Sequence, residues 1–459
     1  MNGRKSRALF LTAAASGVLL NPLNSSMISL ALHGIQQDLH LSFATVSWLI
    51  SAFYLASTIA QPVMGRIGDQ FGRKNTFMAG LSLVAVSALL APWASTFALL
   101  LALRILQAIG SSSIYPSAMA LVRERIQERQ ASALALIAVF TSATAAIGPT
   151  VGGLLIAWGG WRAIFTVNLP IVLVSLVLGW IAFPRDRDAA DKTFKRVALI
   201  PLLKRLDLPG MALFALGLSA LLWFLLSLGT NAHWLAGGIG VVWLAAFVWY
   251  ERRTTKPFIN VRMFTANRAF TLVLLQFIAL NLYNYAIFFG LPSYFQDELH
   301  LNVSTSGLMM LFLSGVSMLV TLVAGRWIDR SGFRRPLIAG TVCMLAASIL
   351  LATLFVGAVL PVMAVVLMLV GVSYGMNNVA LQTAMIRSTP PETTGTASGL
   401  FQASRYMGSI LSSVALGLVF GHDITAGRFR VLACLLIAVS AASLLLSFKQ
   451  RETVETKAA

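Results

Sequence analysis

Polar side chains that could bind a solute lie inside long apolar segments of this 459-residue sequence. The stretch NPLNSSMIS at 21–29 interrupts one apolar run and carries Asn24, an amide that can hydrogen-bond but cannot titrate. Arg104 lies in another apolar run and is followed by Gln107, so the two side chains share one helical face. A cation in mid-membrane costs at least about 2.5 kcal/mol, so it should face a protein or water-filled interior. We interpret these residues as candidates for a cavity that binds a solute.

Three polar stripes with helical spacing occur in the second half of the chain. They are Asn281, Asn284 and Tyr285; Tyr374, Asn378 and Gln382; and Gln402, Arg405 and Tyr406. Spacings of three and four residues place each set on one face of a helix. Such faces either line the cavity or form hydrogen bonds between helices, and the sequence leaves both alternatives open.

The 16 acidic residues lie in loops or at the edges of apolar segments, so the sequence predicts no carboxylate in mid-membrane. Asp69 and Asp297 are edge carboxylates through which proton coupling could run. Arg104 and Arg405 lack obvious acidic partners in the same segments. That leaves room for a solute with an anionic or strongly hydrogen-bond-accepting group.

The sequence predicts neither a metal site nor an enzyme. None of the five histidines is spaced with cysteines or carboxylates as metal ligands are. No intramembrane acid pair occurs, and no nucleophile stands at a recognisable spacing from a base. We therefore expect no cofactor, apart from protons that transport could consume.

The elements that must position these residues are membrane-spanning helices. Hydrophobic residues make up 58% of the chain and charged residues 11%, whereas soluble proteins carry roughly 25% charged residues. A span needs about 20 apolar residues. The fourteen predicted spans are 8–32, 44–64, 76–94, 97–121, 133–157, 161–183, 207–229, 233–250, 268–292, 305–325, 335–357, 360–386, 396–420 and 430–448.

The net charge of +18 reflects topology and not nucleic-acid binding. Most Lys and Arg residues fall in the loops that would share one side of the membrane, as the positive-inside rule requires. We predict a multi-pass protein of the plasma membrane with both termini in the cytoplasm. Its partners would be the lipid bilayer and a small amphipathic or anionic solute, and the protein itself is expected to be a monomer.

One loop pattern occurs twice. GRIGDQFGRK begins at Gly65 and GRWIDRSGFRR at Gly325, an offset of 325 − 65 = 260 residues that also relates the first and ninth predicted spans. We predict an all-α integral membrane protein built from two pseudo-symmetric six-helix halves and a two-helix insert. The halves are 1–206, which ends in a cytoplasmic linker, and 251–459, and the insert is 207–250. Internal repeats with a site at their interface are a recurrent plan of transporters.

The pattern Gly-x-x-x-Asp-x-x-Gly-Arg-Lys resembles the signature loop of the major facilitator superfamily, and the fourteen-span layout resembles its drug:proton antiporter branch. LALRILQAIG (101–110), AAIGPTVGG (145–153) and ASGLFQASRYMGS (397–409) are similar to further motifs of that branch. The resemblance covers nearly the whole chain. It departs at Asn24, where relatives carry an Asp, and at Thr144, where they carry a Gly.

The resemblance implies roles for two sets of residues. A conformational latch would comprise Gly65, Asp69, Gly72, Arg73 and Lys74 with Gly325, Asp329 and Arg330. A closely packed kink would comprise Gly148, Pro149, Gly152 and Gly153. Within the latch, Asp69 could pair with the loop bases or face a helix N-terminus in the other half.

Three hypotheses follow. The favoured one is a multidrug-type exporter of amphipathic organic compounds that works by alternating access and is driven by the proton gradient. The second is a facilitator, or an exchanger of an anionic or lipid-like solute, without conventional proton coupling because Asn24 replaces the acid. The third is a membrane protein that transports nothing, such as a receptor, a scaffold or a lipid-modifying enzyme.

Overall fold

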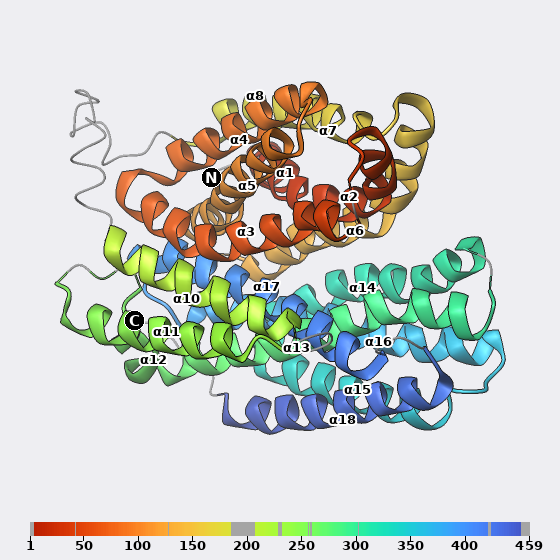
Figure 1. Cartoon of the computed structure of the whole chain (residues 1–459). Coiled ribbons are helices and arrows are strands. Elements are labelled where there is room, and N and C mark those ends of the chain that lie inside the picture. The colour runs from red at the N-terminus through yellow and green to blue at the C-terminus, as the bar shows by residue number, and fades with distance from the viewer. Residues whose placement is uncertain are drawn as a thin grey trace. The chain divides into compact units, whose positions relative to one another are not determined.

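The computed structural model of the chain describes residues 4–41, 43–126, 128–184, 207–227, 232–255, 257, 259–301, 303–420 and 424–450. These ranges are helical between short turns and contain no strand, as predicted (Figure 1). Most of the basic linker predicted before residue 207 lies outside the described residues, as does the side chain of Asp297.

The helices form two compact units, Met1–Val197 with Pro390–Ala403, and Ala198–Thr389 with Ser404–Ala459. The first unit holds α1 (Arg4–Val18), α2 (Leu20–Asp38), α3 (Phe43–Phe71), α4 (Arg73–Leu90), η1 (Ala91–Trp93), α5 (Phe97–Arg125), α6 (Gln130–Gly159), α7 (Ala163–Thr166) and α8 (Asn168–Ala182). The second holds α10 (Leu208–Ser227), α11 (Trp234–Arg253), α12 (Val261–Ala266), α13 (Arg268–Ser293), η3 (Tyr294–Glu298), α14 (Val303–Ser331), α15 (Arg334–Thr353), α16 (Leu360–Arg387) and α18 (Ala426–Lys449). The turn η4 (Pro391–Thr393) precedes α17 (Thr394–Phe420), which starts in the first unit and ends in the second.

The first predicted span is interrupted where its polar stretch begins. Helix α1 ends at Val18 and α2 starts at Leu20. Pro22 has no N–H to donate to the carbonyl of Val18, four residues earlier, so a helix weakens at this point. The polar side chains of Asn21, Asn24 and Ser25 therefore follow a break in the helix.

Twelve helical stretches of the described residues are long and apolar enough to cross a membrane. They coincide with twelve of the fourteen predicted spans, and the count of fourteen is not supported. The exceptions are 44–64 in α3 and 133–157 in α6, where several side chains lie outside the described residues. In α6 the apolar stretch of the described residues is Gln130–Thr141, which is too short to span.

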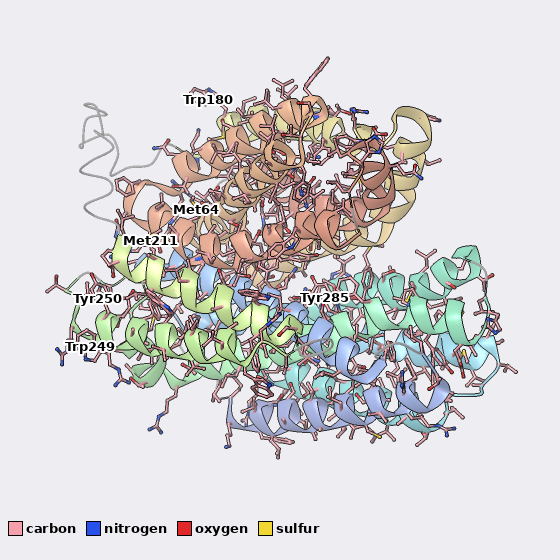
Figure 2. The ribbon with its side chains drawn as sticks, in the orientation of Figure 1. Met64, Trp180, Met211, Trp249, Tyr250 and Tyr285 are labelled. Atoms are coloured by element: carbon pink, nitrogen blue, oxygen red, sulfur yellow. The ribbon has the colours of Figure 1, made fainter. Side chains whose placement is uncertain are left out.

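Large apolar side chains point outward from several of these helices. Trp180 on α8 is 72% exposed and Trp249 on α11 is 57% exposed (Figure 2). In a soluble protein, so many exposed large apolar residues would form an aggregation-prone surface. A lipid environment accommodates them, which agrees with a multi-pass membrane protein.

Each unit has the same scheme of helix packing. In the first unit α5 packs against α3 and α4, and α8 packs against α1 and α4. In the second unit α16 packs against α14 and α15, and α18 packs against α13 and α15. Helices α10 and α11 pack against each other and occupy the predicted insert. Whether they are an insertion between related halves stays a prediction.

Candidate functional site

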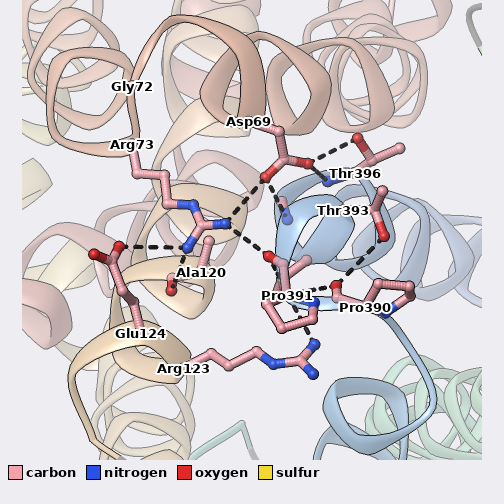
Figure 3. Close-up of polar contacts among 12 residues, drawn as sticks. Asp69, Gly72, Arg73, Ala120, Arg123, Glu124, Pro390, Pro391, Thr393 and Thr396 are labelled. Atoms are coloured by element: carbon pink, nitrogen blue, oxygen red, sulfur yellow. Dashed lines mark hydrogen bonds and ion pairs between the residues drawn. The ribbon is translucent and has the colours of Figure 1, made fainter. Parts of the chain in front are cut away.

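Asp69 lies at the end of α3 and binds the N-terminus of α17 (Figure 3). Its Oδ1 accepts a hydrogen bond from the Gly395 N–H at 3.0 Å. Its Oδ2 accepts bonds from the N–H and the hydroxyl of Thr396, at 2.8 and 3.0 Å. The first N–H groups of a helix have no partner within the helix and carry the positive end of its dipole, so a carboxylate is stabilised there. Asp69 therefore holds α3 to a segment that is 326 residues away in the sequence.

Arg73 joins the same cluster from the start of α4. Its Nη2 donates to the Pro391 carbonyl at 2.8 Å and lies 3.7 Å from Asp69 Oδ1. Its Nη1 donates to the Ala120 carbonyl at 3.1 Å and lies 3.5 Å from Glu124 Oε2. One guanidinium thus connects α3, α5 and the turn before α17. Asp69 satisfies both predicted alternatives, since it pairs with a loop base and also faces a helix N-terminus.

A second arginine supports the beginning of α17. Arg123 on α5 donates from Nη1 to Thr394 Oγ1 at 2.8 Å. That hydroxyl lies 3.2 Å from the Pro390 carbonyl, to which it can donate. Sequence reasoning missed Arg123 and Thr394 as site residues. The two prolines at 390 and 391, followed by Thr394, are nevertheless a helix-start signal that could have indicated them.

The electrostatics of Asp69 are a balance of opposing effects. Burial raises the pKa of the Asp69 carboxyl above its ordinary value of 3.8. Hydrogen bonds from Thr396, the charge of Arg73 and the N–H of Gly395 all act to lower that pKa. Desolvation outweighs them, so this carboxyl takes up a proton more readily than an exposed aspartate does.

Glycines allow α3 and α17 to approach closely. A Cβ built on Gly65 would overlap the carbonyl of Gly395, and one built on Gly399 would overlap the carbonyl of Gln61. The pair Gly395 and Gly399 has the four-residue spacing of small residues at helix contacts in membranes. This spacing is present in the sequence, but the sequence-based prediction of the site did not include it.

Two other predicted latch residues have different tasks. Gly72 adopts φ 103°, a conformation that side chains other than glycine rarely take, and it separates α3 from α4. Lys74 donates from Nζ to the carbonyls of Trp180 and Phe183, at 2.8 and 2.7 Å. Lys74 therefore binds the C-terminal end of α8.

The second copy of the loop pattern lies at the end of α14. Gly325 is buried, Asp329 is half-buried and Arg330 is exposed. Gly332 adopts φ 78° in the turn before α15. The structure thus places all three predicted residues in the last two turns of α14.

The predicted polar residues of the first unit form one hydrogen-bonded chain. Arg104 Nη1 donates to Gln107 Oε1 at 2.6 Å, and Gln107 Nε2 donates to Asn24 Oδ1 at 3.2 Å. Asn24 Nδ2 in turn donates to the Leu20 carbonyl at 2.9 Å. The guanidinium carbon of Arg104 lies 4.4 Å from the centre of the Phe53 ring. These residues come from α2, α3 and α5 and are fully or almost fully buried.

The predicted polar residues on α13, α16 and α17 are brought together in part. Arg405 Nη2 lies 3.5 Å from Asn378 Oδ1, and the guanidinium is 5.4 Å from the centre of the Phe277 ring. The buried members of the three stripes are Asn281, Asn284, Asn378, Gln382, Gln402 and Tyr406, and the half-buried ones are Tyr285, Tyr374 and Arg405. Burial alone fits both alternatives for these stripes, a cavity lining and interhelical hydrogen bonding.

The predicted kink residues lie in α6, which runs from Gln130 to Gly159 without interruption. Gly148 and Gly152 are buried, and the side chain of Pro149 lies outside the described residues. Gly153 is exposed, and a Cβ there would meet nothing within 4 Å among the described atoms. The close packing expected at Gly153 is therefore not observed in this part of the structure.

A comparison with protein families assigns the chain. The sequence profile of the Major Facilitator Superfamily matches residues 14–413. The chain belongs to the major facilitator superfamily. The Asp69 loop and the signature pattern that carries it are thus features of a major facilitator superfamily transporter and not of an enzyme.

Two relatives place this major facilitator superfamily chain among bacterial transporters. It is 53% identical over 456 residues to a Bacillus subtilis (strain 168) protein named "Uncharacterized MFS-type transporter YwoD", covering 99% of this chain and 100% of that protein. It is 32% identical to the "Multidrug resistance protein B homolog" of Mycobacterium tuberculosis (strain ATCC 25618 / H37Rv), covering 87% of this chain and 74% of that protein.

A solved structure shares the superfamily fold. The proton:xylose symporter XylE matches with a TM-score of 0.71 at 14% identity, over 98% of this chain and 97% of that one. At this identity the likeness concerns the fold alone. It supports the assignment of the helices to a major facilitator superfamily transporter.

Proposed function

We propose that this major facilitator superfamily protein exports amphipathic organic compounds across the cell membrane by alternating access. The Mycobacterium relative named for multidrug resistance supports the substrate class. The observation that carries the proposal is the binding of the α17 N-terminus by Asp69. In this proposal the contact is a latch that forms in one state of the transport cycle and breaks in the other.

The latch has the properties of a reversible contact. Its three bonds to Asp69 involve the N-terminal end of a helix, and the adjoining contact is a fit between glycine backbones. Neither component interlocks large side chains, so α17 could leave α3 without rearranging a packed core. Arg73 and Arg123 add charge-assisted bonds that would re-form when the segment returns.

The proposed topology has fourteen spans, with α3 and α6 crossing the membrane as well. These helices have 29 and 30 residues, and at about 1.5 Å per residue they exceed a hydrocarbon core of about 30 Å. The similar helix packing in the two units supports related halves at 1–206 and 251–459, separated by 207–250. Both termini would be cytoplasmic, and the transporter would work as a monomer.

Proton coupling, if the favoured hypothesis holds, would run through Asp69. Asn24 cannot titrate, and its hydrogen-bonded neighbour Gln107 cannot either. Asp69 is a carboxyl whose pKa is already raised by burial at the latch. Protonation there would alter the bonds to α17 and so couple proton uptake to the state of the latch.

A second candidate function is favoured by the same amides. A facilitator, or an exchanger of an anionic or lipid-like solute, needs no titratable group in the interior of the first unit. The uncharged Asn24 and the buried cation Arg104 agree with such a carrier. The two candidates differ in whether a pH gradient drives net flux.

Flux into proteoliposomes separates these candidates. Purified protein would be reconstituted and tested with the cations ethidium and rhodamine 6G and with the anion 1-naphthoate, with and without an imposed pH gradient, against protein-free liposomes. The proposed function predicts accumulation that needs the gradient and falls in Asp69→Ala. Equal flux without the gradient would favour the facilitator, and absence of flux for every amphipathic compound tested would contradict both.

A further inference from the structure

Arg104 is a cation enclosed in the interior of the first unit. Only 1% of its surface is exposed. One of its nitrogens, Nη1, donates to Gln107, and the face of the guanidinium lies against Phe53. Such a site holds the arginine in one orientation and keeps bulk water away from it.

This cation has no counter-charge in the described part of the chain. Arg104 takes part in none of the ion pairs seen there. Its Nε and Nη2 are buried and have no hydrogen-bond partner among the described residues. A buried charge is normally paired, because removing an ion from water costs roughly several kcal/mol even after the protein relaxes.

The two nitrogens without partners form one edge of the guanidinium. The N–H groups of Nε and Nη2 point in parallel from that edge, and their spacing matches the two oxygens of a carboxylate. The opposite side is already occupied by Gln107. The vacant edge therefore favours a planar group with two anionic oxygens over a single acceptor.

The neighbouring amides cannot supply that negative charge. Gln107 bonds to Arg104 and to Asn24, and Asn24 bonds to the Leu20 carbonyl. The amides are neutral at every pH, and this chain of bonds fixes their orientation. The cluster keeps a net charge of +1 unless a ligand neutralises it.

The helices that carry the polar cluster also carry buried apolar side chains. Leu103 precedes Arg104 on α5, and Leu23 precedes Asn24 on α2. Both belong to a buried cluster that also contains Met27, Leu49 and Leu100. These side chains and the Phe53 ring against Arg104 supply apolar groups for the remainder of a ligand that places its carboxylate on Arg104.

We infer that Arg104 binds the carboxylate of the transported compound through Nε and Nη2, so that the substrates are amphipathic organic anions. This inference rests on the proposed transport function and specifies its substrate class. Arg104 is the binding group, and Gln107 and Asn24 are positioning residues that orient it. The uncharged Asn24 is then a requirement for anion binding, because a carboxylate at that position would neutralise the cluster from within.

Equilibrium binding in detergent tests the inference without requiring transport. Isothermal titration would compare 1-naphthoate with 1-naphthalenemethanol and 1-naphthylmethylammonium, which share the ring and differ in charge. A thermal-shift panel of aryl and alkyl carboxylates would extend the test. The wild type should bind the carboxylate at least about tenfold more tightly than the alcohol or the cation, since charge-assisted bidentate bonds are the strong ones.

Variants identify the group that binds. Arg104→Gln should abolish the preference for the anion, and Arg104→Lys should retain part of it because the charge remains without the bidentate edge. Asn24→Asp keeps the size and the acceptor oxygen and should weaken 1-naphthoate binding about tenfold through its charge. Arg162→Gln, at a partly exposed arginine paired with Asp38, is the control and should bind like the wild type.

Several results would overturn the inference. These are tighter binding of the cation or the alcohol than of 1-naphthoate, no stabilisation by any carboxylate of the panel, or unchanged anion binding in both Arg104→Gln and Asn24→Asp. If Arg104→Gln does not fold, the effect of Asn24→Asp on 1-naphthoate binding tests the inference. Binding of carboxylates without flux in proteoliposomes would contradict only the proposed transport. Flux of cationic or neutral compounds without carboxylate binding would contradict only this inference.

Discussion

The turn between α3 and α4 and the turn between α14 and α15 share a backbone conformation but differ in their side chains. Gly72 and Gly332, which are 260 residues apart, both have positive φ, at 103° and 78°. A second pair at the same offset, His40 and His300, has φ of 50° and 52°. Left-handed residues other than glycine are uncommon, so a matched pair of histidines supports a duplicated backbone.

The basic residues that follow these two turns make the same kind of contact. Lys74 donates to the carbonyl of Phe183, just after α8, and Arg334 donates to that of Phe448 near the end of α18. Each base binds the C-terminal end of a helix, α8 or α18, where a cation is favoured by the helix dipole. This part of the loop pattern is structural in both copies.

The copies diverge one residue after the glycine. The first has Arg73, which bonds to Pro391 and pairs with Asp69. The second has Phe333, whose side chain is 97% buried. The difference teaches that the glycine and the base maintain the fold, whereas Asp69 with Arg73 is the part of the motif that binds the N-terminal end of α17 and the turn before it. The following predictions test that division of roles.

The largest effect is expected from Asp69→Ala. It removes the acceptor of three bonds and leaves the N–H groups of Gly395 and Thr396 without that partner. Hydrogen bonds to charged groups contribute about 1.5–3 kcal/mol, so amide hydrogen exchange in the peptide 390–403 should accelerate about 10- to 100-fold. Asp329→Ala is the matched control and should leave exchange in this peptide unchanged. Equal acceleration in both variants would contradict the comparison.

The protonation of Asp69 gives this prediction a pH dependence. Burial raises its pKa in the bound state above the ordinary value of 3.8, so the bound state holds a proton more tightly than a solvated Asp69 would. The contact should therefore strengthen as the pH falls from neutrality through the raised pKa towards 3.8. Asp69→Asn resembles the protonated form and should show slow exchange that, after correction for intrinsic rates, does not vary with pH. A contact that weakens on acidification would contradict the sign.

Gly65→Ala should have the next largest effect. The new Cβ would overlap the Gly395 carbonyl. Overpacking of this kind lowers the free energy of unfolding by about 1–3 kcal/mol. We expect faster exchange in the peptide 390–403 and a lower Tm. Gly315→Ala on α14 is the control, because a Cβ there meets nothing within 4 Å among the described atoms, and it should stabilise the helix slightly. A Gly65→Ala protein as stable as Gly315→Ala would show that α17 does not need this close approach.

Much of the fold could be predicted from the sequence because lipid-facing segments are long and uniformly apolar. Twelve spans followed from that signal alone. The spans predicted at 44–64 in α3 and 133–157 in α6 stay predictions, because several of their side chains lie outside the described residues.

Individual residues of the candidate site could be predicted from the sequence, but their partners in the fold could not. The sequence identified Asp69 because its loop pattern occurs twice and resembles the signature loop of the superfamily. It did not identify Thr396 or Gly395 as partners of Asp69. Gly395 is 326 residues away in the sequence, and nothing near Asp69 indicates which of the many helix N-termini lies beside it in the fold. The Arg104–Gln107 pair followed from spacing, whereas the bond to Asn24 required the tertiary fold.

The smallest expected effect concerns the shared base. Lys74→Met removes bonds to the Trp180 and Phe183 carbonyls at 2.8 and 2.7 Å, whereas Arg334→Met removes one weaker bond at 3.4 Å. A cation at a helix C-terminus contributes about 0.3–1 kcal/mol, so Lys74→Met should lie near the upper end and Arg334→Met near the lower.

Hydrogen exchange at the C-terminal turns of α8 and α18 measures each loss separately. Neither variant should change exchange in the peptide 390–403, because the described bonds of Lys74 and Arg334 run to the C-terminal ends of α8 and α18. If Lys74→Met loosened α17 as much as Asp69→Ala does, the base and the carboxylate would form one cooperative unit. The division of the motif into a structural part and a latch would then have to be abandoned.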